Sequence, residues 1–143
     1  MTAVSKDRHL VYTCHLPIRW GDMDAYGHVN NAMYFRYMEE ARVQMVADWG
    51  AADIAAQHEG PVVITAGCTF LKSVVYPNNM RIDCYVGEPG RSSIMSYYEL
   101  YASSDPEHMV CEGYAKIVWV DHREARSIAI PEKILETIVK RKV

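Results

Sequence analysis

The sequence predicts one α+β domain spanning residues 1–143, because strand-like and helix-like stretches alternate in a simple order. An alternating apolar and polar stretch near the N-terminus precedes one long helical stretch. Four more strand-like stretches follow, separated by short turns, and an amphipathic helix ends the chain. Short turns join antiparallel neighbours, so we expect a single antiparallel sheet.

The first predicted strand covers residues 10–20, where apolar and polar side chains alternate. One face would carry Leu10, Tyr12, Cys14, Leu16, Ile18 and Trp20. A period of two residues is typical of a half-buried strand. Pro17 lacks a backbone N–H, which indicates an edge strand or a bulge.

The long helix is predicted over residues 31–50, with Gly50 as the stop signal. Apolar residues recur there at helical spacing, at Tyr34, Met38, Ala41, Met45 and Trp49. Other apolar residues flank this stripe, so we expect the helix to be central, buried and largely surrounded by protein. The next residues, 51–58, are compatible with a short helix.

The remaining strands are bounded by turns rich in Pro, Asn, Gly, Ser and Asp. They are predicted over residues 62–76, 80–87, 92–103 and 108–121. The last of them carries small residues, Gly113 and Ala115, at the centre of one face, which would let a helix lie close against the sheet. Residues 131–142 are predicted to form the C-terminal helix, with Pro131 at its start.

Composition excludes several classes of function. With 15 Lys and Arg against 18 Asp and Glu, the net charge is -3, which argues against nucleic acid as a partner. No apolar run approaches the ~20 residues of a membrane span, and no export signal precedes the domain, so we expect a soluble cytoplasmic protein without a membrane partner.

The four cysteines are far apart and form no C-x-x-C pair. We expect them to be reduced core residues, because zinc sites require a closer ligand spacing. No metal site and no cofactor is predicted.

The segment "GDMDAYGHVNN", residues 21–31, concentrates polar groups just before the long helix. Asp22 is expected to shape a turn, and Asn30 or Asn31 to cap the helix. A helix start offers free N–H groups and a positive dipole end, which suit a carbonyl oxygen that gains negative charge. A carboxylate folded back toward that point, such as Asp24, would complete the pair that acyl transfer requires.

Three stretches carry a resemblance to a known family: "RWGDMDAYGHVNNAMYFRYMEEAR", "TFLKSVVYPNNMRIDCYV" and "GRSSIMSYYEL". They resemble the hotdog-fold acyl-CoA thioesterases of the 4-hydroxybenzoyl-CoA thioesterase family. The resemblance implies a hotdog fold, in which a five-stranded antiparallel sheet wraps a long central helix. It also implies a homodimer or homotetramer in which subunits pair edge to edge, with active sites at the interface.

The same resemblance implies roles for individual residues. Asp24 would be the catalytic carboxylate, acting as nucleophile or as general base on an acyl-CoA or acyl-carrier-protein thioester. The backbone N–H of Asn31 would polarise the thioester carbonyl. Gly27 would allow a close backbone approach or a positive φ angle next to the substrate. His28 would lie there too, and it would hold the loop together with Asn30 rather than touch the acyl chain.

Three more residues are expected near the substrate. Tyr34 would line an acyl pocket or belong to the helix core. Arg91 and Ser92 would meet the coenzyme A arm, with Lys72, Arg123 and Arg126 as reserve cations. The acyl group itself is left open.

Two other functions remain in competition with hydrolysis. Hotdog hydratases use an Asp and His pair, which Asp24 and His28 would provide, although Asn30 and Asn31 fit the thioesterase pattern better. A non-catalytic acyl-CoA binding module is the second rival.

Overall fold

The structure is a computed structural model that describes residues 7–51 and 58–143. The predicted short helix over residues 51–58 falls almost wholly outside these ranges. The described elements, in chain order, are β1 (His9–Pro17), the 3-10 turn η1 (Trp20–Asp22), α1 (Asn31–Asp48), β2 (Glu59–Phe70), β3 (Asn79–Val86), β4 (Ser93–Ala102), β5 (Met109–Asp121), β6 (Arg126–Ser127) and α3 (Glu132–Arg141).

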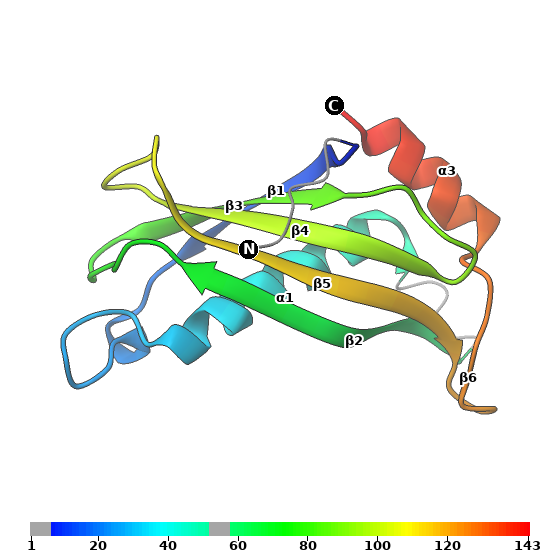
Figure 1. Cartoon of the computed structure of the whole chain (residues 1–143), viewed down its shortest axis with the longest axis horizontal. Coiled ribbons are helices and arrows are strands. Elements are labelled where there is room, and N and C mark those ends of the chain that lie inside the picture. The colour runs from blue at the N-terminus through cyan, green and yellow to red at the C-terminus, as the bar shows by residue number, and fades with distance from the viewer. Residues whose placement is uncertain (1–6, 52–57) are drawn as a thin grey trace.

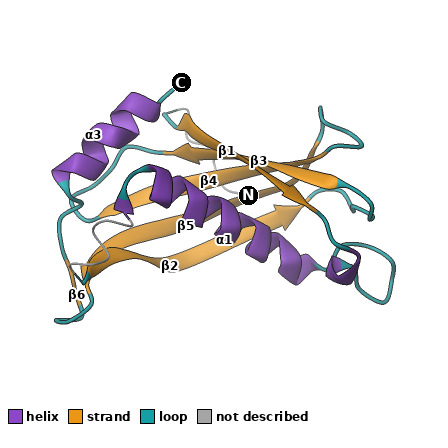
Figure 2. Cartoon of the chain, turned by 180° about the vertical axis from the view of Figure 1, so that it is seen from behind, coloured by secondary structure: helices purple, strands orange, loops and turns teal. Residues whose placement is uncertain are grey.

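The strands form one antiparallel sheet in the order β1-β3-β4-β5-β2, and the short β6 pairs with β5 (Figure 1). Helix α1 lies along one face of this sheet (Figure 2), while α3 packs near β1. The predicted α+β hotdog fold is therefore confirmed. Strands β1 and β2 are the two sheet edges among the described elements.

The core lies between α1 and the inner face of the sheet. Its fully buried members include Met45, Trp49, Ile82, Tyr98, Leu100, Ile117 and Trp119. The small centre of β5 has the predicted effect. A Cβ atom on Gly113 would overlap the Met38 sulfur and would lie 3.1 Å from the backbone oxygen of Gly67. Helix α1 can therefore approach the sheet only because Gly113 has no side chain.

The N-terminal strand is shorter than predicted. It ends at Pro17, and Trp20 lies in η1 with 73% of its surface exposed instead of facing the core. The register of β1 against β3 also shifts between Leu10 and Tyr12, which is a bulge that turns Val11 inward. Pro17 does lie on an edge strand, as predicted.

Strand β2 starts at Glu59 and ends at Phe70 rather than spanning residues 62–76. After Phe70 the backbone turns away, because Leu71 and Lys72 both donate to the Val110 carbonyl. The Val74 carbonyl then accepts a hydrogen bond from Val29, which joins this connection to the loop before α1. Long-range hydrogen bonds thus override the strand propensity of residues 71–76.

The expectation that α1 is surrounded by protein is wrong for the single chain. One face is buried, but Val43 on the other face is 59% exposed and Phe35 is 42% exposed. The five-stranded sheet does not close around the helix, so it covers only one side of α1. An apolar part of α1 is left uncovered.

The cysteines lie in strands, as predicted. All four are free, and Cys14, Cys84 and Cys111 are buried. Burial raises the pKa of the Cys14 thiol to about 11, because the thiolate would lose its hydration. Among the described residues, none of the helices is both long and apolar enough to cross a membrane.

Candidate functional site

The polar loop before α1 is a small, closed hairpin. Met23 and Val29 form an antiparallel bridge, and the Asp24 N–H donates to the His28 carbonyl at 2.8 Å. Gly27 has a φ of 82°, the left-handed conformation predicted for it, and its N–H donates to the Asp24 carbonyl at 3.1 Å. Backbone hydrogen bonds therefore fix where Asp24 leaves the loop.

Asp22 does more than shape a turn. Its side chain is buried, and Oδ2 accepts hydrogen bonds from the Arg19 N–H at 3.0 Å and from the Tyr37 hydroxyl at 2.8 Å. The Arg19 guanidinium lies 3.5 Å from Oδ1. Burial, together with the bond to Asp22, raises the pKa of Tyr37. The loop is thereby tied to the second turn of α1.

Replacing Tyr37 with phenylalanine should destabilise the protein by about 1–3 kcal/mol, because the buried Asp22 carboxylate would lose a donor. The free energy of unfolding in urea measures this loss. Tyr26→Phe is the matched control, since Tyr26 lies in the same loop with 87% of its surface exposed. A Tyr37→Phe variant as stable as that control would show that the bond does not hold the loop.

The start of α1 leaves one donor unused. Asn30 is the N-cap, and its side-chain oxygen accepts from the Ala32 N–H at 3.0 Å. The Met33 N–H donates to the Asn30 carbonyl at 2.8 Å. Within the described part of the chain, the Asn31 N–H has no acceptor, so it is available to a ligand at the positive end of the helix.

Asp24 also keeps an oxygen available. Its Oδ1 accepts a hydrogen bond from the Tyr26 N–H at 2.9 Å, which fixes the carboxylate orientation. Oδ2 has no protein partner among the described residues, and the side chain is only half-buried. An oriented carboxylate with one free oxygen is the arrangement that a nucleophile or base requires.

Most of the predicted site residues line one cavity of about 340 Å³. Its lining includes Asp24, His28, Asn31 and Tyr34, all of which sequence reasoning placed near the substrate. Tyr34 is both a wall of this cavity and a core residue, with 2% of its surface exposed. Burial raises the pKa of Tyr34 to about 12.

The opposite wall was not predicted from the sequence. It is formed by Phe70, Leu71, Lys72 and Ser73, at the point where β2 ends. Phe70 packs edge-on against Tyr34, with 5.3 Å between the ring centroids. Lys72, only a reserve cation by sequence, brings a positive charge to this wall, and its Nζ lies 2.7 Å from Asp105 Oδ2. These residues lie at the same cavity as Asp24 because the backbone bends after Phe70.

Arg91 and Ser92 are not brought together with Asp24 in one chain. They lie in the turn between β3 and β4, where the Ser92 carbonyl accepts from the Trp119 N–H at 2.8 Å. This turn is at the end of the sheet where β2 begins, whereas the cavity is where β2 ends (Figure 1). A single subunit therefore separates the two halves of the predicted site.

A family model described as the thioesterase-like superfamily matches residues 18–138. The PA2801 protein, a candidate thioesterase from Pseudomonas aeruginosa, is 45% identical, with 90% of this chain and 98% of that chain covered and a TM-score of 0.84. No protein of curated function matches the sequence significantly.

Two more distant structures share the fold. A DHNA-CoA thioesterase from Staphylococcus aureus is 18% identical, covers 90% of this chain and 88% of its own, and has a TM-score of 0.80. A thioesterase from Thermus thermophilus, complexed with coenzyme A and Zn, is 24% identical over 92% of this chain and 94% of its own, with a TM-score of 0.78. At such identities, the likeness concerns the fold alone.

Proposed function

This chain belongs to the thioesterase-like superfamily, and from that membership we propose that it hydrolyses acyl-CoA thioesters with Asp24 as the catalytic carboxylate. Membership supports thioester hydrolysis in general. The narrower likeness to the 4-hydroxybenzoyl-CoA thioesterase family stays a prediction.

One observation carries the catalytic assignment: the Asp24 carboxylate and the unused Asn31 N–H line the same cavity. A thioester carbonyl bound there would accept the Asn31 hydrogen bond, and the helix dipole would stabilise the charge that grows on its oxygen. Asp24 would attack the carbonyl carbon to give a mixed anhydride that water then opens, or it would take a proton from an attacking water. In both cases the C–S bond breaks, a C–O bond to water forms, and the thiol leaves with a proton.

Coenzyme A is the carrier that we propose, because the three motif stretches resemble those of acyl-CoA thioesterases. A Thermus thermophilus thioesterase of the same fold is complexed with coenzyme A. Its phosphates need cations, and among the described residues that line the cavity Lys72 is the only Lys or Arg. Acyl carrier protein remains the alternative carrier.

We also propose that two chains pair along β2. This strand is a sheet edge, and it carries exposed apolar residues, with Val63 at 40% and Ile64 at 60% exposure. If two β2 edges pair antiparallel, the end of β2 in one copy lies beside the start of β2 in the other. The Arg91 end of a second copy would then lie at the same end of the combined sheet as Asp24 of the first. A homodimer, alone or within a homotetramer, would thus bring Arg91 and Ser92 of one copy to the same end of the sheet as Asp24 of the other.

An Ile64→Lys variant should shift the protein toward monomers, because a charge on the paired edge would be desolvated or repelled by its symmetry mate. Sedimentation velocity measures the shift. Val139→Lys on α3 is the control, since Val139 is a comparably exposed apolar residue at 64%. If Ile64→Lys sediments like the control, β2 is not the interface.

The function is tested with a panel of acyl-CoAs that differ in chain length and aromatic character. Release of free thiol reports hydrolysis, and loss of enoyl absorbance from crotonyl-CoA without thiol release reports hydration. We expect thiol release from at least one acyl-CoA. Hydration alone, or tight binding with no product, would overturn the proposal in favour of one of the two rival functions.

A further inference from the structure

The uncovered side of α1 faces β2 across an apolar groove, which we call the α1–β2 trench. Two cavities, of about 500 Å³ and about 430 Å³, make up the trench and share Glu39 and Arg42 in their linings. Its walls are mainly apolar, with Phe35, Val46, Pro61, Val63 and Ala66 among the lining residues.

The trench and the candidate site lie along the same face of α1. Asn31, Phe35, Arg42 and Val46 are spaced along α1 so that they share one helix face. Asn31 lines the cavity that holds Asp24, and the other three line the trench. An acyl group whose carbonyl lies at Asn31 and that follows this helix face would therefore reach the trench at Phe35.

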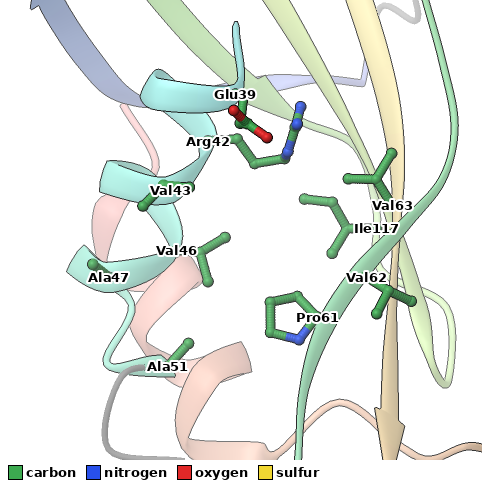
Figure 3. A pocket seen from close by; sticks show the side chains of 10 residues that line it. All are labelled: Glu39, Arg42, Val43, Val46, Ala47, Ala51, Pro61, Val62, Val63 and Ile117. Atoms are coloured by element: carbon green, nitrogen blue, oxygen red, sulfur yellow. The ribbon is translucent and has the colours of Figure 1, made fainter. Parts of the chain in front are cut away.

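Arg42 interrupts the apolar lining. Its side chain extends from α1 into the space between helix and sheet, beside Glu39 (Figure 3). It has no carboxylate partner within 4.0 Å among the described residues, and Glu39 instead pairs with Arg36 at 2.8 Å. A half-buried guanidinium without an anion is unusual, because its desolvation is normally offset by a charged partner.

A chain of buried hydroxyls ends next to Arg42. Ser96 Oγ donates to the Ala115 carbonyl at 2.8 Å, so the Tyr98 hydroxyl must be the donor in its 2.6 Å bond to Ser96. The Tyr98 oxygen then accepts from Arg42 Nη1 at 3.5 Å, and the Arg42 guanidinium carbon lies 5.9 Å from the Tyr98 ring centroid. One of the five guanidinium N–H donors is thus engaged, and the other four have no acceptor among residues 7–51 and 58–143.

We propose that the α1–β2 trench binds an acyl chain that carries a carboxylate at its far end, and that Arg42 binds this carboxylate. The inference rests on the proposed function, because it places the thioester carbonyl at Asn31. An apolar body fits the walls, and a guanidinium with free donors suits a carboxylate in a two-pronged hydrogen bond. The substrates would be thioesters of medium-chain dicarboxylic acids.

The length of the acyl chain follows from helix geometry. Arg42 lies eleven residues beyond Asn31, which corresponds to about 16 Å along the helix axis. Side chains on a helix lean toward its N-terminus, which shortens the path to the guanidinium. With single bonds of ~1.5 Å, an extended chain of about 8–12 carbons covers this distance.

The test compares two non-hydrolysable thioether analogues of a medium-chain acyl-CoA, one ending in a methyl group and one in a carboxylate. Calorimetry gives the affinity ratio between them for the native protein, Arg42→Met and Arg42→Lys. Arg141→Met is the control, since Arg141 is exposed and pairs with Asp48. The ratio should favour the carboxylate in the native protein and fall by about 30-fold or more in Arg42→Met, with partial recovery in Arg42→Lys.

Three results would overturn this inference: an unchanged ratio in Arg42→Met, no binding of either analogue, or equal weakening of both analogues together with dimer dissociation. The last would show that Arg42 pairs with a second copy of the chain. Thiol release from the matching true thioesters separates the two proposals. Hydrolysis without an Arg42-dependent preference refutes only this inference, whereas an Arg42-dependent binding preference without hydrolysis refutes only the proposed function.

Discussion

Asp24→Asn should lower kcat for acyl-CoA hydrolysis by about 10²–10⁴-fold, because asparagine can neither attack the thioester nor take a proton from water. The fold should be unaffected, since the amide oxygen can still accept the Tyr26 N–H that orients the side chain. Thiol release measures kcat, and binding of a thioether analogue shows whether the cavity is intact. Unchanged turnover would refute the assignment of Asp24.

Asp83→Asn is a suitable control for Asp24→Asn. Asp83 undergoes the same chemical change on β3, where it accepts a hydrogen bond from Thr13. Single turnover in isotopically labelled water then tests the nucleophilic role of Asp24. Label in the Asp24 carboxylate indicates a mixed anhydride that water opens at the aspartyl carbonyl, whereas label in the released acid alone fits either a general base or an anhydride opened at the acyl carbonyl.

Gly113→Ala should destabilise the protein by about 3 kcal/mol, at the upper end of the range for overpacked cores. The added methyl group would overlap the Met38 sulfur, and it would also press on the Gly67 carbonyl, which is fixed in the β2 backbone. The free energy of unfolding in urea measures the cost. Gly21→Ala is the control, because nothing lies within 4 Å of a Cβ at that position.

A double-mutant cycle identifies the cause of that cost. Met38→Ala removes the sulfur that the new methyl group would meet, so Gly113→Ala should cost less in the Met38→Ala background than in the native one. Strict additivity of the two changes would mean that the helix does not rest against Gly113.

The order and type of the main elements could be predicted because each has a local signature. Helix α1 combines helical spacing with the Asn30 cap and the Gly50 stop, and Gly50 adopts a φ of 91° just beyond the helix. Element ends were less predictable, because they depend on distant partners. Strand β2 ends where the Leu71 N–H donates a hydrogen bond to the Val110 carbonyl. The two-residue strand β6 forms only because it pairs with β5.

The candidate site was predictable to a similar degree. Asp24 and Asn31 are close in the sequence, and both lie near the start of the predicted helix, so they could be assigned to one site. The hydrogen bond between Asp22 and Tyr37 was not predicted, although a tyrosine flanking the buried stripe needs a partner for its hydroxyl. Lys72 could not be placed, because its approach to Asp24 depends on the turn after β2.

The order of the strands has a consequence for how the chain folds. Strands β3, β4 and β5 are joined by short turns and can pair locally, whereas β2 lies beside β5, so that Glu59 meets Asp121 across the sheet. Contacts between distant residues form later, because a longer loop must close first. During synthesis, β2 has no strand to pair with until β5 has emerged. The wall opposite Asp24 would therefore be among the last parts of the molecule to assemble, and an incomplete chain would expose the β2 edge to aggregation.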